Sequence, residues 1–163
     1  MSKSKTFYLI DGSSYIFRAF FGLRQQLATS KGFPTNALYG FINMLQKVIR
    51  EEKPDYLVVA FDSPDKTFRH KIYPNYKANR DAPPEELSRQ FPYFEPLVKA
   101  YGLSSIRRPG FEADDIIGTL AKKGKQKGLE IVIVSGDKDM MQLISPHIYM
   151  LDTMKNKKFM DKE

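Results

Sequence analysis

Short apolar runs alternate along this chain with segments whose apolar residues recur every three or four positions. Residues 6–11, 56–62 and 130–135 are almost continuously apolar, a pattern typical of parallel strands covered on both faces. Residues 36–52 and 112–127 gather their apolar side chains on one helical face, which predicts amphipathic helices. Because strands and helices alternate, we predict an α/β fold with a mostly parallel central sheet flanked by helices.

The other segments carry weaker patterns. Residues 83–101 start with two prolines and stop before Gly102, which predicts one helix that ends at a C-terminal glycine. The last residues, 155–163, are polar and predict no element. The remaining expected elements are helices at residues 13–22 and 139–143 and strands at residues 103–107 and 148–151.

Seven acidic residues stand where strands are expected to end or a helix to begin. A single Asp at such a place is commonly a helix cap or a turn residue, but three acids within four residues at one helix start exceed what capping needs. Parallel strands place their carboxyl ends on one rim of a sheet, so these side chains should converge. The predicted cluster comprises Asp11, Asp62, Glu112, Asp114, Asp115, Asp137 and Asp139.

So many carboxylates in one place cannot all stay ionised without cations. Hard divalent ions with oxygen ligands are the natural counterions, and two such ions about 4 Å apart can activate water and stabilise the charge that develops during phosphodiester hydrolysis. The chain has 26 Lys and Arg residues against 19 Asp and Glu residues, a net charge of +7. A basic surface around an acidic cluster predicts a polyanionic substrate.

Composition excludes several classes of protein. The chain has no cysteine and two histidines, which rules out disulfide frameworks, thiolate zinc sites and histidine-rich metal sites. No apolar stretch is long enough to cross a bilayer, and the N-terminal residues lead into a strand rather than a signal peptide. We therefore expect a cytoplasmic protein without a membrane partner, and a monomer.

The segment from about residue 63 to residue 82 is basic and aromatic and has no core-facing period, so we expect a partly helical, mobile excursion from the sheet. Lys77 and Arg80 would share a face if the segment is helical there, and could bind a phosphate. Tyr76 could stack on an unpaired base. Arg18 and Arg69 are weaker candidates for phosphate contacts. The alternative for the whole segment is a solvated basic loop.

A set of ordered motifs resembles a known family. The motifs are Leu9-Ile-Asp-Gly-Ser13, Tyr39-Gly-Phe41, Phe61-Asp62, Phe68-Arg-His70, Tyr76-Lys-Ala-Asn-Arg80, Pro109-Gly-Phe-Glu-Ala-Asp-Asp115 and Asp137-Lys-Asp139. Together they resemble the 5′ nuclease domain of bacterial DNA polymerase I, in the flap endonuclease superfamily with its PIN-like fold. The resemblance covers nearly all of residues 1–163, which we treat as one domain.

The resemblance implies a structure-specific 5′-3′ exonuclease or flap endonuclease that uses two Mg²⁺ or Mn²⁺ ions. It implies that the seven acids bind the metals, with Asp11, Asp62 and Asp114 catalytic. Lys77 and Arg80 would also be catalytic and, with Tyr76, would belong to a helical arch through which a single-stranded 5′ end passes. Arg18 would touch phosphates near the scissile bond. Expected substrates are DNA with a 5′ flap or 5′ end, and RNA primer–DNA hybrids.

One departure from the family pattern limits these expectations. Family members continue with a Gly-Asp-x-x-Asp-Asn-type segment, which adds metal-binding aspartates, and with a helix-hairpin-helix-like module that grips duplex DNA; neither occurs in this sequence. We therefore expect a weakened second metal site and reduced activity. Two alternatives stay open, namely a ribonuclease of the wider PIN-like group and a non-catalytic nucleic-acid-binding fragment.

Overall fold

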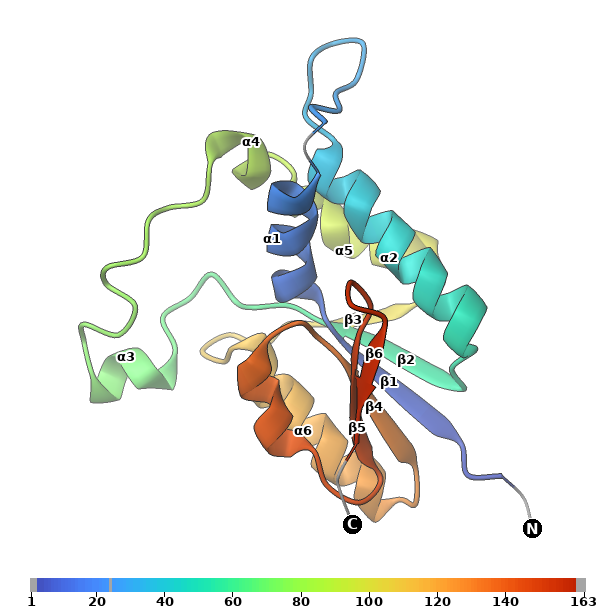
Figure 1. Ribbon diagram of the computed structural model, residues 1–163. Helices are drawn as coiled ribbons and strands as arrows, with labels where there is room; N and C mark the ends of the chain where they lie inside the picture. The colour runs from blue at the N-terminus through green and yellow to red at the C-terminus, as the bar shows by residue number, and fades with distance from the viewer. Residues whose placement is uncertain (1–2, 24, 161–163) are drawn as a thin grey trace.

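The computed structural model describes residues 3–23 and 25–160, and it has a six-stranded sheet in the order β3-β2-β1-β4-β5-β6 (Figure 1). All neighbouring strands are parallel except β6, which runs antiparallel to β5. The predicted α/β fold with a mostly parallel sheet is confirmed. The strands are β1 (Thr6–Asp11), β2 (Tyr56–Ala60), β3 (Ser104–Ile106), β4 (Glu130–Val134), β5 (Ile148–Asp152) and β6 (Lys157–Phe159).

Helices cover both faces of the sheet and make two apolar cores (Figure 1). On one face, alternate strand residues such as Tyr8 and Ile10 pack with α1, α2 and α5. On the other, Leu9 and Ile133 pack with α6 and η2. The helices are α1 (Gly12–Gly22), α2 (Asn36–Glu52), α3 (Phe68–Ile72), α4 (Glu85–Ser88), η1 (Phe91–Tyr93), α5 (Phe94–Ala100), α6 (Ala113–Gln126) and η2 (Lys138–Leu143).

The strand register aligns the ends of the three central strands. Ile10 of β1 lies opposite Val59 of β2 and Val134 of β4, so the residues that follow these three positions emerge on the same rim. Ser104–Ile106 continues the sheet as an edge strand beside β2. This alignment is the feature of the fold that brings the acidic residues together.

The prediction of one helix over residues 83–101 is wrong. The structure has α4, the 3-10 turn η1 and α5 in succession, because Pro92 lacks a backbone N–H and its ring conflicts with the carbonyl four residues earlier. Gly102, at φ 71°, ends the last piece as expected. The polar tail also contains an unpredicted element, since β6 adds an antiparallel edge to β5.

The basic segment is an excursion from the sheet, as predicted, and only one part of it is helical (Figure 1). Helix α3 buries none of its residues. Residues 74–79 form consecutive turns, and Lys77 adopts the left-handed φ of 56°. The expectation that Lys77 and Arg80 share a helical face is therefore wrong, because no helix forms between them.

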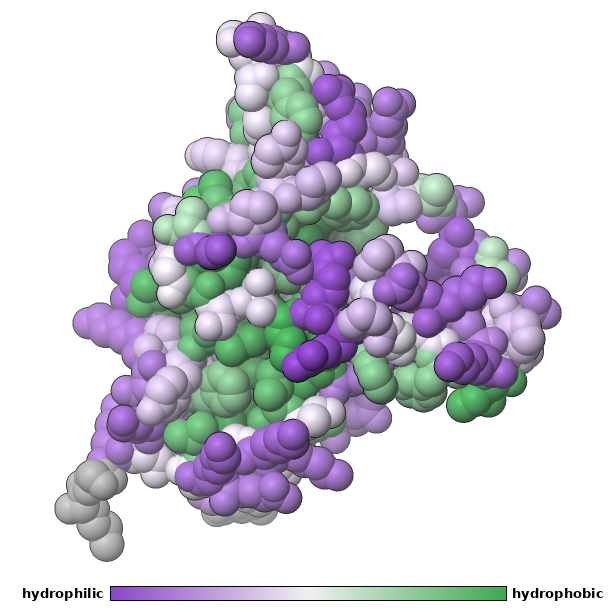
Figure 2. All heavy atoms as spheres, turned by 180° about the vertical axis from the view of Figure 1, so that it is seen from behind, coloured by the Kyte–Doolittle hydropathy of each residue, from purple (hydrophilic) through white to green (hydrophobic). Residues whose placement is uncertain are grey.

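The surface of the molecule is mixed. Viewed from behind, apolar side chains gather in the middle of the face and are bordered by hydrophilic ones (Figure 2). Within the part of the chain that is described, no helix is long and apolar enough to cross a membrane.

Candidate functional site

A pocket of about 280 Å³ lies at the rim where β1, β2 and β4 end. Carboxylates dominate its lining, and three residues of the basic segment, Tyr76, Lys77 and Arg80, form another wall. Of the seven predicted acids, Asp115 is the one that does not line it. The lining residues are Asp11, Ser13, Ser14, Phe17, Asp62, Tyr76, Lys77, Arg80, Glu112, Asp114, Asp137 and Asp139.

Asp11 lies at the centre of this rim and is 3% exposed. It ends β1 and caps α1, where its Oδ1 accepts a hydrogen bond from the Ser14 N–H (3.2 Å) and its Oδ2 accepts one from the Ser135 hydroxyl (2.8 Å). Burial raises the pKa of Asp11 to about 7; these two hydrogen bonds oppose the shift, and the charges of Asp114 and Asp62 add to it. A nearby cation would remove this cost.

Asp62 connects the end of β2 to the start of α6. Its Oδ1 accepts a hydrogen bond from the Ala113 N–H (2.7 Å), and its own N–H donates to the Ser13 hydroxyl (2.8 Å). An ionised carboxylate is favourable at a helix N-terminus because the first N–H groups have no partner in the helix. This bond fixes the first turn of α6 against the rim of the sheet.

The first turn of α6 presents Glu112 and Asp114 to the pocket. Burial, together with the charges of Asp137, Asp62 and Glu112, raises the pKa of Asp114 to about 6. Two carboxyl groups in the same pocket thus have raised pKa values for the same two reasons, burial and mutual repulsion. Clustered pKa shifts of this kind are typical of functional sites.

The turn after β4 brings Asp137 and Asp139 to the rim. The Asp137 N–H donates to the Ser135 hydroxyl (3.1 Å), and the Asp137 Oδ1 accepts from the Asp139 N–H (2.9 Å), which caps η2. Ser135 is fully buried and also donates to Asp11. One hydroxyl group therefore ties the acid of β1 to the acidic turn of β4.

Tyr76 and Lys77 of the excursion contact the same acidic cluster. The Lys77 ammonium group forms an ion pair with Glu112, and the Tyr76 hydroxyl donates to the Glu112 carboxylate (3.3 Å). Burial alone would lower the pKa of Lys77, but the hydrogen bond and charge of Glu112 raise it overall. Arg80 lines the pocket with them.

Asp115 and Arg69 bind each other instead of facing the pocket. The guanidinium group of Arg69 makes two 2.8 Å bonds to Asp115 and a 3.0 Å ion pair with Glu112. The hydrogen bonds from Arg69 lower the pKa of Asp115. This fork-shaped contact holds the base of the excursion on α6. Metal binding by Asp115 and nucleic-acid binding by Arg69 stay predictions.

Arg18 points from α1 towards the end of β5. Its Nη1 lies 3.2 Å from the Asp152 Oδ1, and Asp152 is 3% exposed. The guanidinium group also covers Gly136, where an added Cβ would lie 1.6 Å from the Arg18 Nη1. A side chain at this position would therefore require the Arg18 guanidinium group to move. The phosphate contact of Arg18 stays a prediction.

Sequence reasoning missed three supporting residues. Asp152 follows an apolar strand just as Asp11 does, and that signal could have identified it. Ser13 and Ser135 carry no distinctive pattern, because a serine near a strand end is common in turns. Their roles depend on hydrogen bonds between segments that are far apart in sequence.

The chemistry of the pocket fits a hard divalent cation, since its acidic donors are all carboxylate oxygens. Within residues 3–23 and 25–160, however, no three His, Cys, Asp or Glu side chains are already arranged to hold an ion. Lys77 and Arg69 are paired with Glu112, and the Ala113 N–H donates to one oxygen of Asp62. Ion binding would exchange these internal partners for the metal.

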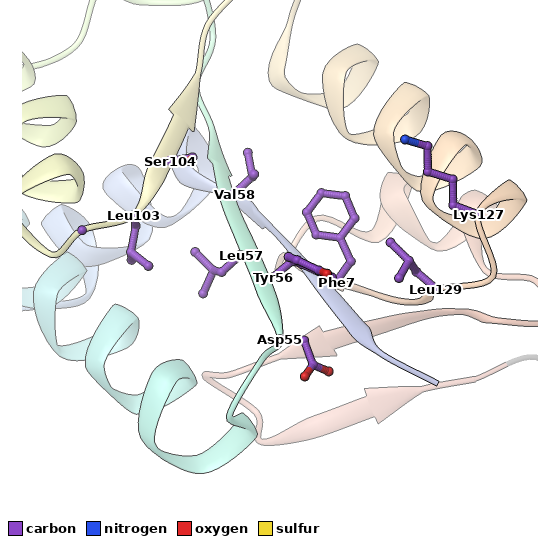
Figure 3. Close-up of a pocket in the computed structure, with 10 residues that line it drawn as sticks. Phe7, Asp55, Tyr56, Leu57, Val58, Leu103, Ser104, Lys127 and Leu129 are labelled. Atoms are coloured by element: carbon purple, nitrogen blue, oxygen red, sulfur yellow. The ribbon is translucent and has the colours of Figure 1, made fainter. Parts of the chain in front are cut away.

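A larger, apolar pocket of about 640 Å³ lies at the opposite end of the sheet (Figure 3). Phe7, Tyr56, Val58 and Leu129 contribute to it, and its one carboxylate is Asp55. The Asp55 Oδ2 accepts a 2.7 Å hydrogen bond from the Thr6 N–H at the start of β1. This pocket therefore has no acidic cluster, and the candidate chemistry belongs to the other end.

The fold and the rim of carboxylates define the class of protein as an α/β domain with a candidate metal site, and comparison with known proteins places it further. Residues 6–163 match the family described as "5'-3' exonuclease, N-terminal resolvase-like domain", and the chain belongs to this family. It is 48% identical over 155 residues to a 5'-3' exonuclease of Aquifex aeolicus, covering 95% of this chain and 53% of that protein. It is 49% identical over 144 residues to DNA polymerase I of Bacillus caldotenax, covering 88% of this chain and 16% of the polymerase.

Solved structures show the same fold at low sequence identity. A bacteriophage T5 5'-exonuclease with bound zinc has a TM-score of 0.72 at 16% identity, with 96% of this chain and 58% of that chain covered. The catalytic core of Rad2 in complex with DNA substrate has a TM-score of 0.58 at 18% identity, with 97% and 48% covered. The chain spans about half the length of the Aquifex relative. The family resemblance and the predicted PIN-like nuclease fold are thereby confirmed.

Proposed function

We propose that this chain forms the metal-binding part of a 5′-3′ exonuclease or flap endonuclease that hydrolyses DNA or RNA-primer phosphodiesters. The observation that carries the proposal is the convergence of six carboxylates on one rim beneath Tyr76, Lys77 and Arg80. Hydrolysis of a phosphodiester uses both parts of this arrangement: basic side chains bind the phosphates, and carboxylates hold the divalent ions.

The proposed metal ligands are the six carboxylates of the pocket, with Asp115 as an outer residue through its contact with Glu112. Mg²⁺ or Mn²⁺ bound there would polarise the phosphodiester and lower the pKa of water. We propose two ions, with the second weakly held by this chain alone. The proposed ligands are Asp11, Asp62, Glu112, Asp114, Asp137 and Asp139.

The cationic residues act on the substrate itself. Lys77 is held at the mouth of the pocket by Glu112 and can transfer its ion pair to a phosphate. Arg80 lies on the same wall and can bind a second phosphate oxygen. Tyr76 offers an aromatic ring to an unpaired base next to them. We propose that the excursion over residues 63–82 acts as the gateway for a 5′ end, in a monomeric protein.

Two alternatives make different predictions. A PIN-like ribonuclease would cut single-stranded RNA, and a non-catalytic fragment would bind DNA with a steep salt dependence and cut nothing. We expect Mg²⁺-dependent cleavage of a 5′-flap DNA, with at least tenfold less cleavage of single-stranded RNA of the same sequence. Gel analysis of labelled substrates measures both. Faster cleavage of the RNA would favour the ribonuclease, and DNA binding without cleavage would favour the fragment.

Ser135→Ala should weaken Mn²⁺ binding by about tenfold to a hundredfold, because hydrogen bonds to metal-binding side chains hold them in the orientation that the ion needs. The Ser135 hydroxyl donates to Asp11 and accepts from the Asp137 N–H, so both acids lose a fixed partner. Calorimetric titration with Mn²⁺ measures the affinity. Ser14→Ala is the matched control, because Ser14 contacts Asp11 through its backbone N–H and should retain that bond. Equal affinity in both variants would contradict the role of Ser135.

A further inference from the structure

A groove of about 620 Å³ runs between α6 and η2 and meets the acidic pocket. Asp114 lines both cavities, so the groove continues directly from the rim where the carboxylates converge. Arg69 lies at this junction, paired with Asp115. Whatever occupies the acidic pocket therefore has an open path along α6.

One face of α6 forms a wall of the groove. Asp114, Gly118, Ala121, Lys122 and Lys125 all line it and recur at helical spacing, so they make a stripe that leads away from the rim. Gly118 and Ala121 have small side chains, so the middle of this wall projects little into the groove. The charge along the stripe changes from acidic at the pocket to basic at the far end.

The lysines supply the positive charge of the groove. The guanidinium group of Arg69 is already neutralised by Asp115 and Glu112. Neither Lys122 nor Lys125 is paired with a carboxylate among the residues that the structure describes, and Lys125 makes only a 3.3 Å contact with the Ser145 hydroxyl. Their ammonium groups can therefore bind an anionic partner without breaking an ion pair.

The opposite wall offers a mixture of polar and apolar groups. Gln142 and Ser145 present polar side chains, and Met140 and Leu143 present apolar ones. Phosphates bind ammonium groups and amide or hydroxyl donors, whereas sugars and bases also pack on apolar side chains. A groove with both kinds of group fits a flexible nucleic-acid strand.

We propose that this groove holds the single-stranded part of the substrate as it leaves the acidic pocket. The inference rests on the proposed nuclease function and adds a path for the strand. The stripe from Asp114 to Lys125 is about 16 Å long at the helical rise of about 1.5 Å per residue. At a spacing of about 3.4 Å per stacked nucleotide, it accommodates roughly five nucleotides.

The same helix provides a matched control for the test. Lys122 and Lys125 line the groove, whereas Lys123 of α6 and Lys127, the residue that follows α6, line two other pockets. The double variants K122A/K125A and K123A/K127A lose the same charge from α6 and the residue that caps its C-terminus. Long-range electrostatics changes equally in both, so a difference between them reports the groove.

The experiment measures binding of a fluorescein-labelled thymidylate dinucleotide and octamer by anisotropy, in EDTA and in calcium. K122A/K125A should bind the octamer about tenfold more weakly, and the slope of log K against log salt should fall by about 1.4, because each lost contact contributes about 0.7 for a single strand. In calcium, which can hold the phosphate in the acidic pocket, binding of the dinucleotide should change by less than about twofold, because a dinucleotide bound there does not reach the lysines. K123A/K127A should bind both oligonucleotides like the unmodified chain, and the melting temperatures of both variants confirm folding.

Equal losses in the two double variants would overturn the groove and leave only a solvated basic helix. A loss for the dinucleotide as large as for the octamer would also overturn it, because the lysines would then act close to the acidic pocket. These outcomes are independent of cleavage. If the chain cleaves a 5′-flap DNA but the lysine variants do not affect the octamer more than the dinucleotide, the groove is wrong and the proposed function stands. If the octamer is affected selectively but the chain does not cleave, the groove stands and the proposed function is wrong.

Discussion

Asp114→Asn should reduce Mg²⁺-dependent cleavage of a 5′-flap DNA by about a hundredfold to a thousandfold, comparable to the loss of one strong transition-state contact. Asp114 lies in the pocket with Asp62, Asp137 and Glu112, whose charges all act on it. Asparagine keeps the shape and removes the negative oxygen that a divalent ion prefers. Cleavage under single-turnover conditions measures the effect on chemistry.

Binding of the same DNA helps to distinguish the three candidate functions, namely a 5′ nuclease, a PIN-like ribonuclease and a non-catalytic binding fragment. In EDTA, Asp114→Asn should bind the flap as tightly as the unmodified protein or more tightly, because one charge that repels phosphate is gone. Asp65→Asn is the matched control, since Asp65 lies outside the pocket and accepts a hydrogen bond from Ser63 (2.9 Å). Cleavage that survives Asp114→Asn, or falls equally in Asp65→Asn, would contradict the assigned site.

The convergence of acids on one rim could be predicted from the sequence because it follows from topology. Asp11, Asp62 and Asp137 each follow an apolar run, and parallel strands leave their carboxyl ends on one edge. The structure places β2, β1 and β4 next to one another. Strand order itself was not predictable, yet the rule needs only that the strands are parallel and near neighbours.

The sequence could not predict which of Glu112, Asp114 and Asp115 line the acidic pocket. Asp114 and Asp115 are consecutive on α6, so their side chains point about 100° apart, and Asp114 lines the acidic pocket whereas Asp115 does not. The residue that turns away is set by Arg69, which arrives from α3 and takes both oxygens of Asp115. That contact joins segments 46 positions apart, and local patterns carry no information about it.

The conformation of the basic segment around Lys77 and Arg80 also could not be predicted from local sequence patterns. Spacing suggested a shared helical face for Lys77 and Arg80, but Lys77 adopts a left-handed backbone conformation. Its ammonium group is directed by Glu112, an attraction between elements that outweighs helical propensity. The partner of Arg18 is equally non-local, since Asp152 lies 134 positions away.

Asp11→Asn should raise the melting temperature of the metal-free protein at pH 8 by roughly 5–10 °C, which corresponds to about 2–4 kcal/mol. Burial raises the pKa of Asp11 to about 7 from its ordinary value of 3.8. An acid whose pKa is higher in the folded state costs stability when it is ionised. The cost is absent below about pH 4, grows between pH 4 and pH 7 and is complete above pH 7, and asparagine removes it.

Thermal unfolding followed by circular dichroism from pH 4 to pH 8 in EDTA measures this difference. Asp55→Asn should act in the opposite direction, because hydrogen bonds from Thr6 lower the pKa of Asp55, and its ionised form stabilises the fold. Added Mg²⁺ should stabilise the unmodified protein more than Asp11→Asn, since a ligand that binds only the folded state raises its stability. If Asp11→Asn melted at a lower temperature than the unmodified protein in EDTA at pH 8, the prediction would be wrong. The ionised Asp11 carboxylate would then not destabilise the metal-free fold.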